Sequence, residues 1–355
     1  MTHTRRDFAK LLAATAAGGS VPAWAAAATS APGSQSFING VQLGVQTYSY
    51  HEIPNDGANH LDAIIRDMQA TGAYACELFA QQVAPGVLTG KPPSPADCGK
   101  PLHGCTPGKG GTERNPFRWV FATYSGDELA AVRARQKHWN ETVSMDFYRD
   151  VRKRMNDAGI AITNYNIMYP ADASDLETNR FFEAAHVLGA TSLNLSPKFT
   201  LVEKLAPFAD KHQMMIGVHG HSITWDSNEF STMATFERAF ALSRYIGANL
   251  DIGHYTATGE DPIAFIDKHH DRITNLHLKD RRRNSPESAK THIEDGASVP
   301  WGQGDTRIAD VLLHLKKTRY PIPAYIEYEH AGALSPVDEV KKAYQYCVSI
   351  LEKKS

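Results

Sequence analysis

The sequence lacks the features that mark nucleic-acid-binding and membrane-spanning proteins. Charge of one sign is not in excess, because 37 Lys and Arg stand against 39 Asp and Glu, a formal net charge of −2. A chain so balanced offers no basic surface of the kind that binds nucleic acid. No apolar run reaches the roughly 20 residues that a membrane-spanning helix needs. We therefore expect neither nucleic acid nor a membrane span.

Cysteine is also scarce, and the four cysteines form no metal-binding pattern, since Cys-x-x-Cys does not occur. Cys98 and Cys105 flank a Gly- and Pro-rich loop and are the expected pair if the chain reaches an oxidising compartment. Cys76 falls in an apolar run and Cys347 in a helical pattern, where buried free thiols are expected. The sequence therefore predicts one candidate disulfide.

Histidine, in contrast, is abundant, with 16 residues in a chain of 355. The composition is otherwise ordinary for a globular protein with a large core, with 42% hydrophobic and 21% charged residues. Histidine binds metals and exchanges protons near neutral pH. The positions of the histidines therefore decide what the excess indicates.

The first residues are typical of an export signal. The stretch Thr4-Arg5-Arg6-Asp7-Phe8-Ala9-Lys10 resembles a twin-arginine motif, an Ala- and Leu-rich region follows, and Ala23-Trp24-Ala25 offers a cleavage site. We expect a signal peptide over 1–26, a linker over 27–40 and a periplasmic protein. The alternative is an Ala-rich helix that happens to carry two arginines.

From residue 41 to 355, short apolar runs alternate with amphipathic helical patterns. The expected strands are 43–48, 75–79, 160–167, 192–196, 215–219, 248–252, 273–278 and 324–328. The expected helices are 61–68, 140–158, 173–188, 201–211, 232–246, 262–270, 307–318 and 336–353. Eight strand-then-helix units predict an α/β protein whose parallel sheet closes into a (β/α)8 TIM barrel.

Two details favour this barrel over an open, doubly wound sheet. A doubly wound sheet usually has a Gly-rich phosphate turn after its first strand, and none is present. Glycines also stand where helices should end before a strand. These expected caps are Gly72, Gly159, Gly189 and Gly247.

One long segment, 82–138, interrupts the alternation after the second strand and is rich in Pro and Gly. A loop that follows a barrel strand lies on the active-site face, and a loop this long is usually functional or disordered. We expect a lid-like insertion whose Arg118 and Trp119 contact substrate. A surface insertion with no catalytic role is an equal alternative.

Polar residues gather where five of the strands end. They are Glu77 on the second strand, His219 and His221 on the fifth, Asp251 and His254 on the sixth, His277, Lys279 and Asp280 on the seventh, and Glu327 and Glu329 on the eighth. Catalytic groups of TIM barrels cluster at these ends. A divalent metal offsets the cost of grouping such charges, and mixed N/O ligands suit Mn, Co, Zn, Fe or Mg.

These residues resemble the xylose-isomerase-like TIM-barrel superfamily, often labelled sugar phosphate isomerase/epimerase. The matching pieces are 43–48, Gly217-Val218-His219-Gly220-His221, Leu250-Asp251-Ile252-Gly253-His254, Leu276-His277-Leu278-Lys279-Asp280, 301–305 and Ile326-Glu327-Tyr328-Glu329. The resemblance spans roughly 40–350 and implies one metal ligand from each of strands five to eight. The implied ligands are His221, with His219 as the alternative, then Asp251, His277 and Glu327.

The other site residues carry competing interpretations. The catalytic candidates are His219, His254, Lys279 and Glu77, and Trp301 joins the insertion residues as a substrate contact. The ordinary alternatives are a hydrogen-bonded His254, an ion pair of Lys279 with Asp280, and a salt bridge of Glu77. The run Arg281-Arg282-Arg283 is expected as a solvated loop, with anion binding as the alternative.

The resemblance implies proton transfer beside a sugar carbonyl, with the charge stabilised by the metal. Export would keep the enzyme away from phosphorylated sugars, so we expect a metal-dependent isomerase/epimerase-type enzyme acting on a non-phosphorylated sugar or keto-sugar. Epimerases of the superfamily commonly have Glu on the fifth strand where this chain has His, which keeps a second hypothesis open. It is a lyase or dehydratase that cleaves 3-keto-glycosides by β-elimination. A non-catalytic sugar-binding protein is the third.

Overall fold

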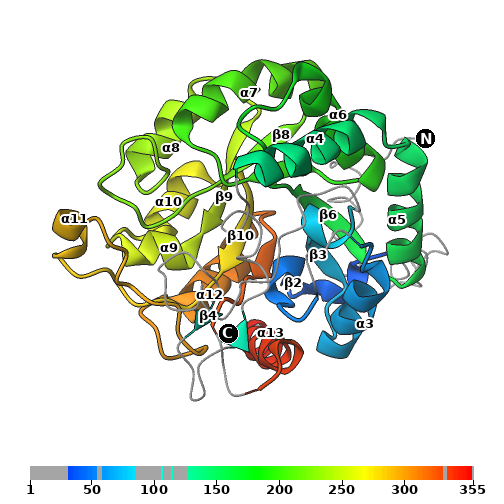
Figure 1. Ribbon diagram of the computed structural model, residues 1–355. Helices are drawn as coiled ribbons and strands as arrows, with labels where there is room; N and C mark the ends of the chain where they lie inside the picture. The colour runs from blue at the N-terminus through cyan, green and yellow to red at the C-terminus, as the bar shows by residue number, and fades with distance from the viewer. Residues whose placement is uncertain are drawn as a thin grey trace.

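Eight parallel strands close into a barrel in the computed structural model, and helices form a ring around them (Figure 1). The structure describes residues 31–53, 58–84, 105–106, 113–114, 126–330 and 334–353. Residues 1–30, with the expected signal peptide, lie outside these ranges, as does most of the expected insertion. Within the described ranges, no helix is long and apolar enough to span a membrane.

The barrel strands pair in chain order around the ring. They are β2 (Val41–Gln46), β3 (Ala75–Phe79), β6 (Ala161–Asn166), β7 (Ser192–Leu195), β8 (Met215–His219), β9 (Ile246–Asp251), β10 (Ile273–Leu278) and β11 (Ala324–Ile326). Strand β2 pairs with both β11 and β3, which closes the ring and confirms the predicted (β/α)8 barrel. Strand β1 (Phe37–Ile38) adds an antiparallel partner to β2, and β4 (Cys105–Thr106) pairs with β5 (Glu113–Arg114) in a separate ribbon.

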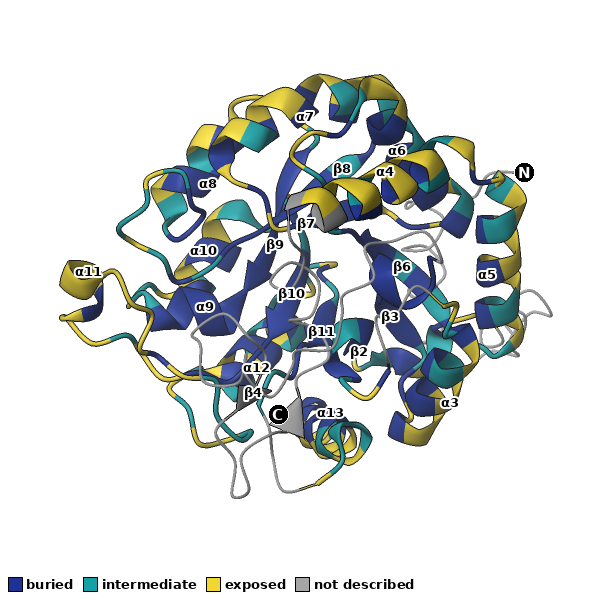
Figure 2. Cartoon of the chain, in the orientation of Figure 1, coloured by how far each residue is buried: buried dark blue, intermediate teal, exposed yellow. Residues whose placement is uncertain are grey.

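The helices cover the outside of the barrel with their apolar faces inward, so that Figure 2 shows buried strands and helices exposed on one side. The helices are α3 (Leu61–Thr71), α4 (Gly126–Thr142), α5 (Met145–Asp157), α6 (Asp175–Leu188), α7 (Phe199–His212), α8 (Met233–Phe240), α9 (Ile252–Ala257), α10 (Pro262–His269), α11 (Ser288–Thr291), α12 (Ile308–Thr318) and α13 (Pro336–Glu352). Short 3-10 turns are η2 (Ser34–Ser36), η3 (Thr47–Ser49) and η4 (Ala80–Gln82).

Three local predictions were wrong. The end of the expected irregular segment is helical, because α4 begins at Gly126, and the single helix expected over 140–158 starts anew at Ser144, whose side chain caps α5. Gly247 lies inside β9 instead of capping a helix. A Cβ there would lie 2.4 Å from the carbonyl oxygen of Arg272, so close strand contact explains this glycine.

The barrel interior is partly polar, and two glycines make room for large side chains in it. A Cβ on Gly44 would lie 2.6 Å from the ring of Tyr325, and a Cβ on Gly217 would lie 2.1 Å from Oδ1 of Asn194. Outside this interior, Cys76 and Cys347 are buried free thiols, as predicted.

Candidate active site

The alternation of a strand brings the polar strand-end residues to one side of the barrel wall. Side chains two positions apart share a face, so Asn275, His277 and Lys279 of β10 and its extension point into the barrel one above another. In the strand register, His277 pairs with Asp251 of β9. The next residue of β10, Leu278, pairs with Ile326 of β11. Neighbouring strands thereby bring their polar ends together.

Four of these residues form one cluster, which we call the tetrad: His219, Asp251, His277 and Glu327. Each offers one ligand atom, and these atoms all lie within 4.8 Å of one another. All four side chains are buried. The sequence had favoured His221 over His219 as the ligand of the fifth strand, whereas the tetrad contains His219.

His277 is held between two carboxylates. Its Nε2 lies 2.8 Å from Oε2 of Glu77 and its Nδ1 lies 3.0 Å from Oε2 of Glu327. Burial would lower the pKa of His277, but Glu327 and Glu77 raise it well above the usual value. The ring is therefore fixed in position and, without a bound cation, protonated.

Asp251 uses its two oxygens for different tasks. Oδ1 accepts the backbone N–H groups of Gly253 and His254, both at 2.8 Å, and so caps α9 where it follows β9 directly. Oδ2 accepts no well-aligned hydrogen bond from the described residues, although Nζ of Lys279 lies 3.0 Å away. One oxygen is thus committed to the fold and the other faces the cluster.

Lys279 supplies a buried positive charge beside the tetrad. Its Nζ lies 2.8 Å from Glu327, 2.9 Å from Glu329 and 3.0 Å from Asp251. Burial would lower the pKa of Lys279, but the three carboxylates raise it well above its usual value. The expected alternative partner, Asp280, instead accepts the backbone N–H groups of Gly302 and Gly304.

The tetrad fits a divalent metal ion. It joins two imidazoles and two carboxylates, a mixed donor set that suits several divalent metals. Nδ1 of His219 is buried and has no hydrogen-bond partner in the part of the chain that the structure describes. Burial lowers the pKa of His219 to about 4, which leaves the ring neutral at pH 7 and able to act as a ligand.

A second histidine group lies beside the tetrad, formed by His221 and His254 together with His219. Nδ1 of His221 lies 3.2 Å from Oε1 of Glu229, and although burial opposes it, this carboxylate raises the pKa of His221. NH1 of Arg281 lies 2.8 Å from Nδ1 of His254. A cation is disfavoured there, because the guanidinium already holds positive charge against the ring.

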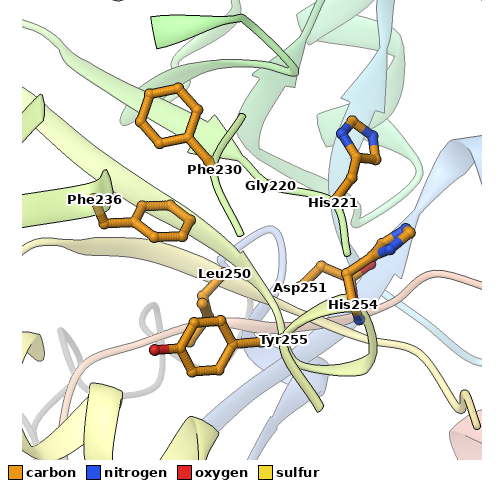
Figure 3. Close-up of a pocket in the computed structure, with 8 residues that line it drawn as sticks. All are labelled: Gly220, His221, Phe230, Phe236, Leu250, Asp251, His254 and Tyr255. Carbon is orange, nitrogen blue, oxygen red and sulfur yellow. The ribbon is translucent and has the colours of Figure 1, made fainter. Parts of the chain in front are cut away.

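The pKa values of His221 and His254 are shifted in opposite directions. Burial, followed by the charges of Arg281 and Lys279, lowers the pKa of His254 well below the usual value. His254 is therefore neutral at pH 7. The imidazoles of His221 and His254 lie close together in Figure 3, with ring centroids 5.1 Å apart, whereas the rings of Phe236 and Tyr255 lie on the opposite side.

Both groups open into a cavity of about 780 Å³, a volume typical of a small-molecule site. Its polar wall comes from the ends of β8 to β11 and includes the tetrad histidines, Glu327 and Lys279. Its other wall is mainly apolar and comes from β3, β6, β7 and the segments after them. That wall includes Phe79, Ile167, Met168, Tyr169, Leu195 and Leu201.

The remaining predicted site residues lie elsewhere. Glu77 is fully buried beneath His277 and is not among the residues that line the cavity. Trp301 lines a separate recess with Asp280 and Tyr346 and is not among the residues that line this cavity, so its role as a substrate contact stays a prediction. Arg118 and Trp119, like the candidate disulfide of Cys98 and Cys105, lie outside the described residues.

The sequence reasoning missed two groups that line the cavity, Arg281 and Glu294, and one behind His221, Glu229. Arg281, expected in a solvated loop, is only 7% exposed, although Arg282 and Arg283 are exposed as expected. Glu229 lies in the loop after β8, and Glu294 lies 3.7 Å from Arg281 in the loop after β10. None of the three follows directly on a strand, so strand-end patterns could not find them.

The fold and the cluster together define a TIM-barrel protein with a candidate metal centre at the carboxyl ends of its strands. The chain belongs to the xylose isomerase-like TIM-barrel family, whose family model matches residues 124–350. An inosose dehydratase from Lacticaseibacillus casei is 31% identical over 106 residues, 29% of this chain and 34% of the relative. One from Clostridium beijerinckii is 25% identical over 158 residues, 41% of this chain and 51% of the relative. The chain thus spans a third to a half of these curated relatives.

Solved structures share the fold over most of the chain. The IolI protein, whose crystal structure contains a bound zinc atom, has a TM-score of 0.53 and 13% identity, covering 87% of this chain and 97% of its own. A sugar phosphate isomerase/epimerase from Parabacteroides distasonis has a TM-score of 0.52 and 14% identity, covering 88% and 95%. At these identities the likeness establishes the fold alone.

Proposed function

We propose that the protein is a metal-dependent enzyme that removes a proton from the carbon beside a carbonyl in a non-phosphorylated sugar or keto-sugar. Returning the proton would isomerise or epimerise the sugar. One observation carries the proposal: three members of the tetrad (His219, His277 and Glu327), the charged Lys279 and the neutral His254 line one cavity. Proton abstraction of this kind needs a base together with fixed positive charge at the carbonyl oxygen.

The tetrad would hold the divalent metal, which supplies a Lewis acid that polarises the sugar oxygens. His254 is neutral and lines the cavity, so its ring can accept the proton from carbon, and the charges of Arg281 and Lys279 then favour rapid release of that proton. The electron pair left behind moves toward the carbonyl oxygen. Lys279 stays protonated, and its charge favours that developing negative charge.

A second candidate function, β-elimination, is favoured by a pair of histidines whose pKa values are shifted in opposite directions. While His254 takes the α-proton, the proton that Glu229 stabilises on His221 could go to a departing β-oxygen. The carbon–oxygen bond then breaks, a carbon–carbon double bond forms, and water or an alcohol leaves. The resemblance to inosose dehydratases supports this outcome. Its substrates would be keto-sugars such as 3-keto-glycosides.

The absence of a phosphate on the substrate rests on the proposed export. The twin-arginine-like stretch at Arg5-Arg6 and the small residues at 23–25 support a periplasmic enzyme. Removing residues 2–26 would test this directly. We expect the full chain in the periplasmic fraction and the shortened chain in the cytoplasm, and equal distribution of the two would contradict export.

The catalytic proposal is tested by incubating the metal-loaded protein with a 3-keto-glucoside, and separately with an inosose, in D2O. Proton return should give an isomer with deuterium at the α-carbon, detected by NMR. Elimination should give an unsaturated ketone and released aglycone or water. Asp251→Ala and Glu327→Ala should abolish both signals. Sugar binding without deuterium exchange, unchanged in both variants, would support a non-catalytic binding protein instead.

A further inference from the structure

Glu77 lies at the floor of the site as a carboxylate with no exposed surface. Oε2 accepts hydrogen bonds from Nε2 of His277 and Nδ2 of Asn275, both at 2.8 Å. Oε1 accepts from Nδ2 of Asn166 at 2.6 Å and of Asn249 at 3.2 Å. Nε2 of Gln46 also donates to Oε1, at 3.5 Å. Donors from four strands, β2, β6, β9 and β10, thus converge on one side chain of β3.

The amides around Glu77 have a fixed direction. Oδ1 of Asn275 accepts from Nδ2 of Asn194 at 2.8 Å, so Nδ2 of Asn275 must face Glu77. Oδ1 of Asn249 accepts from Asn275 at 2.9 Å, which turns its own Nδ2 toward Glu77 as well. The network therefore presents only donors to position 77. A carboxylate, which only accepts, satisfies it, whereas an amide would set one NH2 group against these donors.

The same logic places a proton on Nε2 of His277. Because Glu77 can only accept, the nitrogen that faces it must carry a proton, and that nitrogen is Nε2. Nδ1 is left on the side of Glu327 and the rest of the tetrad. Metal-binding histidines commonly donate their second nitrogen to a carboxylate, which orients the ring.

We propose that Glu77 is a positioning residue: held by its amide network, it locks Nε2–H of His277 and directs Nδ1 toward the metal centre. The inference rests on the proposed function in assigning His277 as a metal ligand. Glu77 is no general base, since both its oxygens are already bonded and it does not line the cavity.

Zinc affinity tests this role without any substrate. Zn²⁺ is titrated into the metal-free full chain against a chromophoric chelator, for the wild type and for Glu77→Gln. We expect the variant to lose about 10- to 100-fold in affinity. Glu177→Gln is the matched control, because Glu177 is equally buried and accepts from Asn140 and Arg133 of α4, and none of the three belongs to the tetrad or lines the cavity. Its zinc affinity should stay within twofold of the wild type.

Equal zinc affinity of Glu77→Gln and the wild type would overturn the inference, as would a wild-type protein that binds no zinc. A second measurement uses the wild type alone, so it does not depend on the variant folding. The ¹⁵N shifts of His277, assigned by comparison with His277→Gln, should show Nε2 protonated with and without zinc. Zinc on Nε2 with a proton on Nδ1 would overturn the inference. Intact zinc binding without deuterium exchange on a sugar would instead contradict the proposed function and leave the role of Glu77 standing.

Discussion

Lys279 and Glu327 form an ion pair with 2.8 Å between Nζ and Oε2, and both side chains are buried. The ammonium therefore stands beside two of the four tetrad members, because Asp251 also lies within 3.0 Å of it. A bound metal and Lys279 would share the same carboxylates. This arrangement links the stability of the empty site to its ability to take up a cation.

Replacing Lys279 by Met should strongly destabilise the metal-free protein. The change leaves Asp251, Glu327 and Glu329 without their common partner, and removing one side of a buried pair costs about 3–5 kcal/mol. A divalent metal would compensate part of this loss, so urea unfolding should show more stabilisation by zinc in Lys279→Met than in the wild type. Lys290→Met, which removes an exposed pair with Glu287, serves as the control and should change neither value. Equal stabilisation by zinc in the variant and the wild type would contradict the shared-carboxylate arrangement.

Glu229→Gln should lower the turnover number without weakening metal binding. Glu229 contacts His221 at 3.2 Å and is no member of the tetrad. Loss of its charge removes the group that favours the protonated imidazole, so a proton donor is lost while the metal ligands remain. A drop of about 10²-fold in kcat is the scale of acid–base catalysis. The measurement is the α-deuterium exchange or release assay run beside the zinc titration, and a parallel loss of zinc affinity would speak against this role.

The metal-free protein should lose stability on acidification between about pH 6.5 and 4. Burial lowers the pKa of His219 to about 4, while the unfolded histidine titrates near 6.5. In this window the unfolded chain binds a proton that the folded protein does not, so stability falls by up to about 1.4 kcal/mol per pH unit for this group. His254, with its pKa also lowered by burial, acts in the same direction. Denaturant unfolding at several pH values, with His219→Gln as comparison, should show a shallower acid limb in the variant.

His277 gives the opposite slope above neutrality. Its pKa is raised well above the usual value by Glu327 and Glu77, so its stabilisation is complete below pH 6.5 and is lost as the pH rises through the folded pKa. His219, His221 and Asp251 also face this part of the site. Stability of the metal-free protein should therefore pass through a maximum near neutral pH, and a monotonic rise to pH 9 would contradict this expectation.

Trp301→Phe should leave ligand binding in the main cavity within twofold of the wild type. The tryptophan lines the recess beside Asp280 and Tyr346, away from the tetrad wall. His254→Gln is the comparison, because His254 lines the cavity itself. Sugar affinity measured by calorimetry for both variants decides the point, and a larger loss in Trp301→Phe than in His254→Gln would support the role expected from the sequence.

The barrel was readable from the sequence because its strands are buried on both faces and so appear as short, nearly continuous apolar runs. Because the strands are parallel, Asp251, His277 and Glu327 were expected at the same end of the barrel. The start of α4 was not predicted, because the Pro- and Gly-rich stretch before it led us to expect irregular structure over the whole of 82–138. A helix on the barrel surface needs only a few apolar contacts.

The choice between His219 and His221 could not be made from the sequence. The two residues are two positions apart, so strand alternation sends both to the same face. Only the approach of Asp251 from β9, of Glu327 from the end of β11 and of Glu229 from a loop separates them. Arg281 escaped for a similar reason, because its burial depends on the path of the loop after β10, including the carbonyl of Gly296 that it contacts.

The hydrogen bond between Glu77 and His277 joins residues 200 positions apart, across the line where the ring of strands closes. The four tetrad residues come from β8 to β11, but the carboxylate beneath them comes from β3, near the start of the fold. A chain that has formed only its later strands can gather the ligands without orienting His277. During refolding, tight zinc binding should therefore recover at the rate of the slowest and most non-local strand pairing, that of β2 with β11.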